Sequence, residues 1–357
     1  MIRTAIIGAG IGREHLEGYR ALPGRFEVTT LCDLDLDRAR SVAADRIGVT
    51  DDLDAVLADD GIDLVDVCLP PHLHVPVSTR ALQAGRHVVC EKPLALSLAD
   101  CDALIGTAAT AGRRVFPVFQ YRYGIAMAQM RALLEAGLAG RPFAAALETH
   151  WNRGPDYYAV PWRGTWAGES GGAVLSHAIH NHDLLLSVFG DAAALSASTA
   201  TRVNGIETED CAAILIEHDT GALSTSSITL GAASDTTRLS FTFEGFTATS
   251  GTAPYRPAAE GWTFTARAPT AQSEIDAVLA DVAPPLAGFA GFFEAIADAL
   301  EGRGGREVTL QDGRRSIELV TAAYQSARTG GRVALPLSEA APLYRSWLPA
   351  MDRHATA

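Results

Sequence analysis

The first third of the chain repeats one pattern, in which a short apolar run is followed by a segment with helical periodicity. The apolar runs are nearly continuous in hydrophobic residues, which is typical of strands covered on both faces of a parallel sheet. They lie at Arg3–Gly8, Phe26–Asp33, Leu64–Leu69, His87–Cys90 and Arg114–Phe119. Helices are expected between them, at Arg13–Ala21, Asp35–Arg46, Asp52–Ala58, Val75–Ala84 and Leu98–Ala111. This alternation predicts a doubly wound α/β domain over residues 1–121.

The pattern changes after residue 121, where β-like runs follow one another and helices stand before and after them. The β-like runs are Pro142–His150, Leu195–Thr201, Cys211–Glu217, Ala222–Thr229, Arg238–Phe243 and Phe246–Ser250. The expected helices are Ala126–Ala136, Ala173–Phe189, Leu286–Leu300 and Leu310–Ala327. Residues 122–357 are therefore expected to form an α+β domain with a largely antiparallel open sheet.

Three glycines separate the first predicted strand from the first predicted helix, in the run GAGIG at residues 8–12. Glycines at such a turn let the backbone approach a pyrophosphate, and the helix that follows offers free N–H groups to it. The spacing GxGxxG is typical of dinucleotide-binding Rossmann domains, but here the third glycine comes one residue early. A tight connection between a strand and a helix would need a similar run of glycines even without a bound phosphate. We expect a shortened phosphate turn made by Gly8, Gly10, Ile11 and Gly12.

Asp33 ends the second predicted strand, about 20 residues beyond the glycines. A carboxylate in this position can accept hydrogen bonds from the adenosine ribose hydroxyls, and it repels a 2′-phosphate. The sequence therefore favours NAD as the cofactor. Arg38 lies close enough in sequence to keep NADP possible.

Composition narrows the range of partners. Of 357 residues, 48% are hydrophobic and 20% are charged, and the formal net charge is −13. An acidic chain without a block of basic residues is a poor candidate for binding nucleic acid or an anionic membrane. The five cysteines are odd in number and form no CxxC pair, so a reducing compartment and a cytoplasmic location are expected.

The segment Asp66–Leu94 reads DVCLPPHLHVPVSTRALQAGRHVVCEKPL. It resembles the signature of the Gfo/Idh/MocA oxidoreductases, in which a strand ends in a Pro-containing turn, a helix reads ALxAGKH and the next strand ends in EKP. Similar segments continue at Val118–Gly124, Gly137–Phe143, Gly171–Asp183 and Ser326–Leu337. The resemblance covers nearly the whole chain and implies an NAD(P)-dependent oxidoreductase with a Rossmann domain and a substrate domain.

Several site residues follow from the resemblance alone. On the cofactor side it implies contacts from Leu69, Pro70, His74, Glu91 and Gln120. On the substrate side it implies Lys92 beside the reacting hydroxyl, and further positions at Tyr121, Trp162, Arg163, His180 and Asp183. One departure concerns Ser176, because many sugar and polyol dehydrogenases of the family have an Asp four residues before the catalytic His.

The chemistry of these residue types fits hydride transfer. A partly buried lysine beside a positive ring has a lowered pKa, so Lys92 can stabilise an alkoxide or relay its proton. Ser176, His180 and Asp183 are expected on one helix face, where Asp183 would hold the ring of His180 as it accepts the proton. A purely structural His180 satisfied by Asp183 is the alternative. His177 could line the same pocket, and no metal is expected, although His177, His180, His182 and Asp183 lie close together in sequence.

The loop from Trp151 to Gly172 is rich in aromatic residues, which pack well on the C–H faces of sugars but also pack in cores. Asn152 and Arg163 could supply hydrogen bonds to hydroxyls. We therefore expect reversible oxidation of a secondary hydroxyl on a sugar, sugar derivative or cyclic polyol. A dinucleotide-binding sensor without activity and a reductase of an unsaturated or imine substrate are the alternatives. The resemblance also implies a homodimer or homotetramer, because the open C-terminal sheet of the family often packs face to face.

Overall fold

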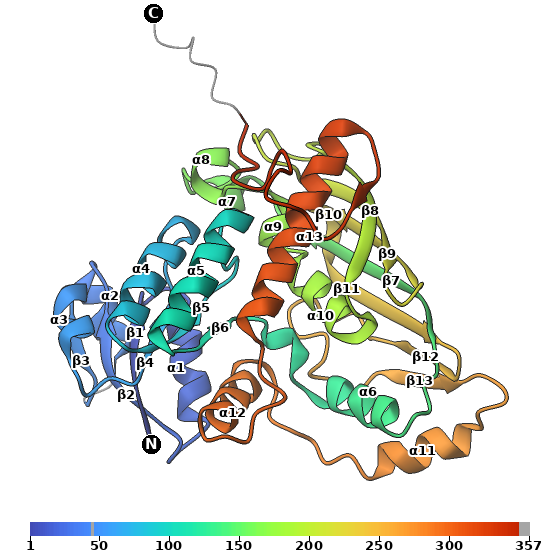
Figure 1. Cartoon of the computed structure of the whole chain (residues 1–357), viewed down its shortest axis with the longest axis horizontal. Coiled ribbons are helices and arrows are strands. Elements are labelled where there is room, and N and C mark those ends of the chain that lie inside the picture. Colours follow the sequence, from blue (N-terminus) through green and yellow to red (C-terminus); the bar gives the residue numbers. More distant parts are fainter. Residues whose placement is uncertain (44–45, 350–357) are drawn as a thin grey trace, which may run out of the picture.

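The computed structural model describes residues 1–43 and 46–349, which form two sheets with helices packed around them (Figure 1). The six-stranded sheet has the order β3-β2-β1-β4-β5-β6, and the eight-stranded sheet has the order β13-β12-β11-β7-β10-β9-β8-β14. Among the described helices, none is both long enough and apolar enough to cross a membrane. The long C-terminal helix α13 (Leu310–Thr329) lies between the two sheets and packs against β8 on one side and α5 on the other.

All neighbouring strands of the first sheet are parallel, which confirms the predicted doubly wound α/β architecture. Its strands are β1 (Ile2–Ile7), β2 (Phe26–Cys32), β3 (Gly48–Thr50), β4 (Leu64–Val67), β5 (His87–Cys90) and β6 (Val115–Pro117). Its helices are α1 (Gly12–Arg20), α2 (Leu36–Val42), α3 (Leu53–Ala58), α4 (Pro71–Gln83) and α5 (Leu98–Ala111). The strand order reverses between β1 and β4, and ligands of such sheets bind beyond the carboxyl ends of the strands at that point.

Two details of this domain differ from the expectation. Strand β3 was not expected, because three residues are too few to show a hydrophobic period. The helix expected over Asp35–Arg46 ends at Val42. Residues 44 and 45 of that expected helix lie outside the described part of the chain.

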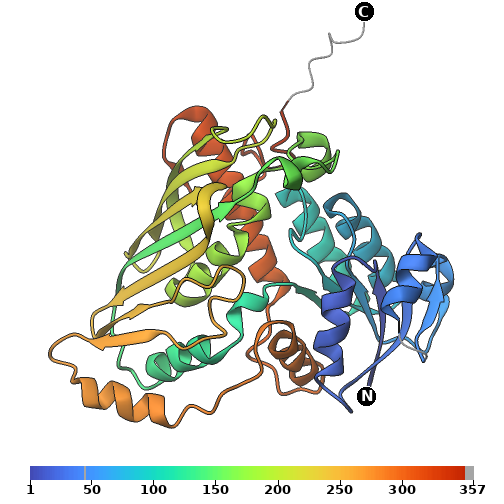
Figure 2. The same ribbon diagram turned by 180° about the vertical axis from the view of Figure 1, so that it is seen from behind.

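The second sheet is largely antiparallel, as predicted, with one parallel pair between β7 and β10. Its strands are β7 (Pro142–Asn152), β8 (Ala192–Ala200), β9 (Cys211–His218), β10 (Leu223–Thr229), β11 (Gly231–Phe243), β12 (Phe246–Thr249), β13 (Thr263–Ala266) and β14 (Val333–Ala334). Side chains alternate across it: Ile214 and Ile216 of β9 are buried beneath the helices, whereas Leu215 is exposed on the other face. Helices therefore cover one face, and the other face is open (Figure 2).

The remaining helices connect and flank this sheet. They are the short 3₁₀ helix η1 (Gln120–Arg122), α6 (Ile125–Glu135), α7 (Pro155–Tyr158), α8 (Trp166–Glu169), α9 (Ala173–Ser176), α10 (Ile179–Phe189), α11 (Gln272–Ala280) and α12 (Gly288–Leu300). The single helix expected over Ala173–Phe189 is wrong, because the chain breaks at His177, which adopts φ −119° and ψ −54°.

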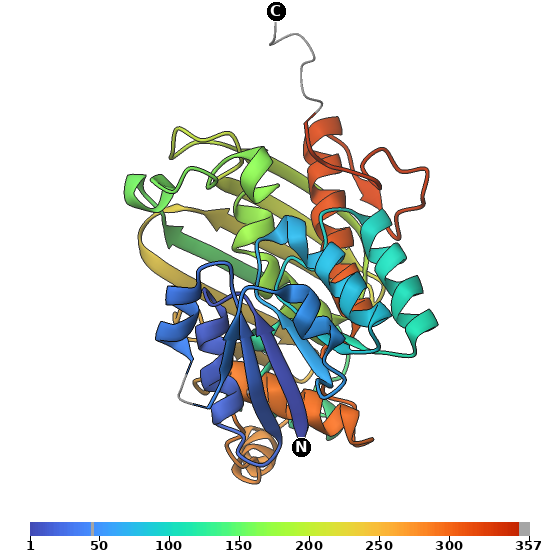
Figure 3. The same ribbon diagram turned by 90° about the vertical axis from the view of Figure 1, so that its left-hand side faces the viewer.

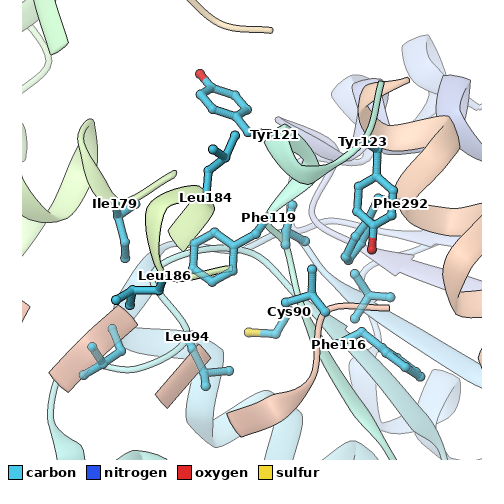
Figure 4. Packing of buried hydrophobic residues seen from close by; sticks show 14 of the residues in the cluster. Cys90, Leu94, Phe116, Phe119, Tyr121, Tyr123, Ile179, Leu184, Leu186 and Phe292 are labelled. Atoms are coloured by element: carbon cyan, nitrogen blue, oxygen red, sulfur yellow. The ribbon is translucent and has the colours of Figure 1, made fainter. Parts of the chain in front are cut away.

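Late segments of the chain complete the first domain. Helix α12 packs against α1 (Figure 3). At this contact the rings of Tyr19 and Phe293 stack with centroids 3.8 Å apart. At the other end, the backbone N–H of Leu98 donates to the carbonyl of Tyr344 at 3.1 Å. Figure 4 shows Phe119, which follows β6, packed where the parallel sheet meets α10. The two domains thus share one continuous core.

Candidate active site

The glycine turn after β1 is open to a phosphate at its middle residue. Gly8 has φ +106°, and a Cβ there would lie 2.3 Å from the carbonyl oxygen of Cys68. A Cβ at Gly12 would lie 2.8 Å from Ile6, so this glycine allows α1 to pack closely on β1. No heavy atom lies within 4 Å of a Cβ built on Gly10. The three glycines therefore supply a tight turn, an open approach and close helix packing, and the residues fit a dinucleotide despite the shortened spacing.

Asp33 lies at the end of β2, directly beside this turn. Its Oδ2 accepts the backbone N–H of Ala9 at 2.7 Å, and its Oδ1 accepts the N–H of Asp35 at 2.8 Å. Arg38 donates to both oxygens, at 2.7 and 3.3 Å. Burial alone would raise the pKa of Asp33, but these hydrogen bonds lower it, so the carboxylate is ionised. The Asp33–Arg38 pair thus puts a carboxylate and a cation directly beside the glycine turn.

Leu69, Pro70 and His74 surround the carboxyl end of β4. Pro70 precedes the first residue of α4, and Leu69 approaches Gly8, with its Cδ2 3.4 Å from a Cβ built on that glycine. The two ring nitrogens of His74 lie 2.7 Å from the carbonyl oxygens of Leu69 and Pro93. His74 therefore ties the loop after β4 to the loop after β5.

Lys92 follows β5 and is the single lysine in the sequence. Its Nζ donates to the carbonyl oxygen of Ser176 at 3.0 Å, and its backbone N–H donates to Glu91 Oε2 at 2.9 Å. Burial lowers the pKa of Lys92, and the positive charge of Arg163 lowers it further, while Glu91 and Glu169 oppose this. Lys92 thus reaches from the first domain to the second and has a neutral partner at its ammonium group.

Glu91 belongs to a buried polar cluster beneath this lysine. His15 Nε2 lies 3.0 Å from Glu91 Oε1, and His15 Nδ1 lies 2.8 Å from Asp66 Oδ2. Tyr19 donates to the same Asp66 oxygen at 3.0 Å. Burial would lower the pKa of His15, but Asp66 raises it well above its usual value, so the ring is an imidazolium held by two carboxylates. Burial would raise the pKa of Glu91, whereas His15 lowers it to about 2.

This cluster includes a possible metal-ligand group of His15, Asp66 and Cys68, whose donor atoms lie within 4.8 Å of one another. Protein groups already pair these atoms: Cys68 Sγ lies 3.3 Å from His15 Nδ1 and 3.5 Å from Asp66 Oδ1. Burial raises the pKa of the Cys68 thiol, which disfavours the thiolate that a metal would need. The cluster is therefore an internal ion-pair network.

His180 lies in the first turn of α10, between aromatic rings. The ring of Tyr121 stacks on it at a centroid distance of 4.5 Å, and Phe119 contacts it edge-on at 5.8 Å. Its Nδ1 is buried without a hydrogen-bond partner in the described part of the chain. Burial and the charge of Lys92 lower the pKa of His180 to about 3, so its ring is neutral and close to Lys92.

The expected contact between Asp183 and His180 is wrong. Both oxygens of Asp183 accept hydrogen bonds from Arg122, at 2.6 and 2.7 Å, and this pair is buried. Arg122 also lies 3.4 Å from Asp312 of α13. Asp183 therefore joins η1, α10 and α13. The two residues share α10, but Arg122 occupies both oxygens of Asp183, while the His180 ring stacks on Tyr121.

The aromatic loop supplies the other wall of the site. His177 contacts Trp151 and Tyr157, with ring centroids 5.4 and 5.8 Å away, and its Nδ1 has no partner among the described residues. Burial lowers the pKa of His177, and the charges of Lys92 and Arg163, among others, add to this effect. Lys92, His177, His180 and Arg163 are thus brought together by the fold.

Other expected site residues are less enclosed. Trp162 is 46% exposed, and Asn152 is also exposed, with its backbone N–H donating to Asp235 Oδ1 at 2.6 Å. Gln120 lines a cavity of about 390 Å³ together with Tyr255 and residues of α1 and α12. The Oε1 atom of Gln120 is buried without a partner in the described structure. Gln120 is therefore available for a ligand, whereas nothing encloses the Asn152 side chain.

Sequence reasoning missed His15, Arg122 and Glu169. His15 and Arg122 each pair with carboxylates more than 50 residues away in sequence, so no local spacing marks them. The carboxylate of Glu169 is buried behind the loop and accepts the N–H of Gly164 at 2.7 Å. Lys92, in contrast, stands out in the sequence, because it is the only lysine and the chain otherwise uses arginine.

Comparisons with known proteins agree with this geometry. Residues 2–119 match the Gfo/Idh/MocA oxidoreductase family model for an NAD-binding Rossmann fold, and residues 127–249 match a Gfo/Idh/MocA C-terminal domain model. D-apiose dehydrogenase of Paraburkholderia graminis is 31% identical over 235 residues, which cover 62% of this chain and 59% of that protein. The match thus spans less than two thirds of that relative.

Two further matches extend over nearly the whole chain. D-apiose dehydrogenase of Rhizobium rhizogenes is 26% identical over 358 residues, covering 93% of this chain and 97% of that protein. The crystal structure of the WlbA dehydrogenase from Bordetella pertussis in complex with NADH and UDP-GlcNAcA has 28% identity and a TM-score of 0.82, and the match covers 94% of this chain and 99% of that one. The chain therefore belongs to the Gfo/Idh/MocA family of oxidoreductases, and its N-terminal domain is the NAD-binding Rossmann domain of that family.

Proposed function

We propose that this protein is an NAD-dependent dehydrogenase that oxidises a secondary hydroxyl of a sugar, sugar derivative or cyclic polyol. The observation that carries the proposal is the position of Lys92. Its buried ammonium group extends from the carboxyl end of β5 to Ser176 in the second domain, next to the neutral ring of His180. The glycine turn at residues 8–12 lies at the same edge of the parallel sheet.

Lys92 and His180 have different roles in the removal of the hydroxyl proton. Bound NAD supplies the hydride acceptor in this chemistry. The lowered pKa of Lys92 increases its ability to take the hydroxyl proton at neutral pH, and in its charged form it stabilises a developing alkoxide. His180 is neutral, so it can accept a hydrogen bond from the same hydroxyl and orient it. Tyr121 fixes the plane of the His180 ring by stacking.

The names of relatives support a carbohydrate substrate. They include D-apiose dehydrogenase and the inositol 2-dehydrogenase 1 of Saccharopolyspora erythraea, which is 32% identical over 146 residues. The aromatic loop of this chain agrees, because Trp151, Tyr157 and Trp162 offer ring faces for the C–H groups of a sugar.

The open face of the second sheet supports a homo-oligomer. Leu215 and Leu223 are 43% and 52% exposed there, and neighbouring outward positions are mostly Ala, Ser and Thr. Small and apolar side chains allow a second copy to pack flat on this face, so a dimer through it is part of the proposal. We also place the protein in the cytoplasm, since all five cysteines are free thiols.

The proposal is tested in two steps. The purified protein is titrated with NADH and with NADPH by Trp fluorescence, for wild type and for Asp33→Ala. NADH should bind more tightly, and Asp33→Ala should weaken it. NAD reduction is then followed at 340 nm with a panel of sugars, sugar acids and polyols. Tight NADH binding without turnover of any member would favour a sensor over an enzyme, and absence of binding would reject the cofactor assignment.

A further inference from the structure

Arg163 is held rigidly at the wall of the proposed site. A Cβ at the next residue, Gly164 (φ +70°), would lie 2.6 Å from Ile206, so only glycine fits there. The N–H of Gly164 donates to the buried Glu169 carboxylate at 2.7 Å. The Arg163 guanidinium carbon lies 3.9 Å from the ring centroid of Tyr157. The loop and the stacking together fix where the guanidinium fork lies.

Within the described part of the chain, the guanidinium of Arg163 stacks on Tyr157 but donates no hydrogen bond to a protein acceptor. Its Nε is buried without a hydrogen-bond acceptor, and no ion pair within residues 1–43 and 46–349 includes Arg163. The neighbouring Arg153 differs, because it pairs with Asp235 at 2.9 Å. A buried donor without an acceptor is unfavourable unless a ligand supplies the acceptor.

Neither cation of the site forms a side-chain hydrogen bond with an anionic group of the described residues. Lys92 donates to a neutral carbonyl of Ser176, and Arg163 has no direct anionic partner among the described residues. Glu169 is the acid close to both, and burial raises its pKa, which weakens it as a counter-charge. The side chain of Glu91 pairs with His15, and no ion pair in the described structure joins it to Lys92 or Arg163.

The positive charges of the site also act on the pKa values of His177 and His180. The charges of Lys92 and Arg163 contribute to the lowered pKa of His177, and Lys92 contributes to that of His180. Nδ1 of each ring is buried without a partner in the described structure. The pocket is therefore electropositive and has unused polar atoms on two sides.

We propose that the substrate is a sugar acid whose carboxylate binds Arg163 while Lys92 contacts the hydroxyl that is oxidised. This inference rests on the proposed dehydrogenase function and names its substrate class. A guanidinium fork matches a planar carboxylate with two parallel hydrogen bonds. A carboxylate would supply the acceptor that the Arg163 Nε lacks, and D-glucose 6-phosphate tests whether a phosphate does so better.

The test compares matched pairs of substrates with NAD. The pairs are D-glucuronate with D-glucose, D-galacturonate with D-galactose, and D-gluconate with D-glucitol, and D-glucose 6-phosphate is added as a dianionic probe. In the wild type, kcat/KM for at least one acid should exceed that of its neutral partner about 10- to 100-fold, the range of one charge-assisted pair. Arg163→Gln should bring this ratio close to one, and Arg163→Lys should restore part of it.

Arg141→Gln is the matched control. Arg141 is an exposed arginine that also lies over an aromatic ring, that of Phe143, and is paired with Glu244. Its loss removes the same charge without touching the pocket, so the ratio of acid to neutral substrate should stay at the wild-type value. NADH binding by all three variants verifies that the first domain is folded.

Three results would overturn the proposal. The kcat/KM of every neutral substrate could equal or exceed that of its acid, or Arg163→Gln could lower the kcat/KM of both members of a pair by the same factor. D-glucose 6-phosphate could also have the highest kcat/KM of all probes. Failure of the dehydrogenase function gives a separate signal. In that case none of the probes reduces NAD. Binding of D-glucuronate and of D-glucose to the NADH complex is then measured by calorimetry. Tighter binding of glucuronate that Arg163→Gln abolishes supports the carboxylate site, and equal or absent binding overturns it.

Discussion

His15 Nε2 lies 3.0 Å from Glu91 Oε1, so the helix that follows the glycine turn is joined to the residue that precedes Lys92. The same ring bonds Asp66 through Nδ1 at 2.8 Å, and neither His15 nor Asp66 is exposed. Glu91 in turn accepts the backbone N–H of Lys92. Two hydrogen bonds thereby connect helix α1 to the backbone of the proposed catalytic lysine.

Replacing His15 with Leu should strongly destabilise the fold. Two carboxylates would remain buried without their cation, and breaking a buried pair in this way costs about 3–5 kcal/mol. Urea unfolding measures the loss. His150→Ala is the control, because His150 binds only Ser227 at the surface and its removal should cost less than about 1 kcal/mol. Equal losses in the two variants would show that the His15 network is unimportant for stability.

The stabilisation from His15 should depend on pH in a defined direction. The folded pKa of His15 is raised, so its contribution is complete below the unfolded value of about 6.5 and is lost as the pH rises toward the folded pKa. The folded pKa of Glu91 is about 2, so its contribution is complete above an unfolded value of about 4.3 and is lost as the pH falls toward 2. The difference in unfolding free energy between wild type and His15→Leu should be largest between about pH 4.5 and 6.5. A difference that grows steadily above pH 7 would contradict this sign.

Because Lys92 is the only lysine, its pKa can be read directly. Reductive methylation with ¹³C-formaldehyde labels one ε-amino group besides the N-terminus, and its chemical shift reports protonation. The pKa of Lys92 should lie below the ordinary value of about 10.4. Arg163→Gln should raise it, since one neighbouring positive charge is removed. An unshifted titration would remove the case for Lys92 as proton acceptor.

Lys92→Met keeps much of the side-chain volume and removes the proton site. Turnover should fall at least about 100-fold, the lower range for loss of a general acid or base, while NADH affinity stays within a few-fold of wild type. Stopped-flow single turnovers separate the chemical step from product release. Retained turnover would assign the proton step to another group.

The Arg122–Asp183 pair should behave as a structural unit. Arg122→Met leaves Asp183 buried and unpaired and should cost about 3–5 kcal/mol in urea unfolding, whereas the double variant with Asp183→Leu should recover part of that loss. Arg141→Met provides a surface control. If the double variant is no more stable than Arg122→Met, the two residues do not depend on each other.

The sequence predicted the parts of the fold that repeat locally. The apolar runs of β1, β2, β4 and β5 and the change to an antiparallel sheet follow from hydrophobic period alone. Strand β3 has three residues, and the break at His177 follows from tertiary packing, so neither leaves a periodic signal.

The site was predictable where a motif is contiguous. The glycine turn at residues 8–12 and the EKP segment could be recognised, and both lie at one edge of the sheet. Asp183 was assigned to the wrong partner because Arg122 lies 61 residues away in sequence. Separations of 51 and 76 residues likewise hid the pairing of His15 with Asp66 and Glu91.

The packing of α12 on α1 has a consequence for how the chain is made. Tyr19 and Phe293 stack face to face, yet ribosomes separate their synthesis by on the order of tens of seconds, at about 5–20 residues per second. Over that interval the nascent Rossmann segment has its glycine turn but an uncovered apolar flank, and its α5 end still lacks Tyr344. Competence to hold the dinucleotide therefore arises late in translation, and the half-finished chain is the form most exposed to chaperones and to aggregation.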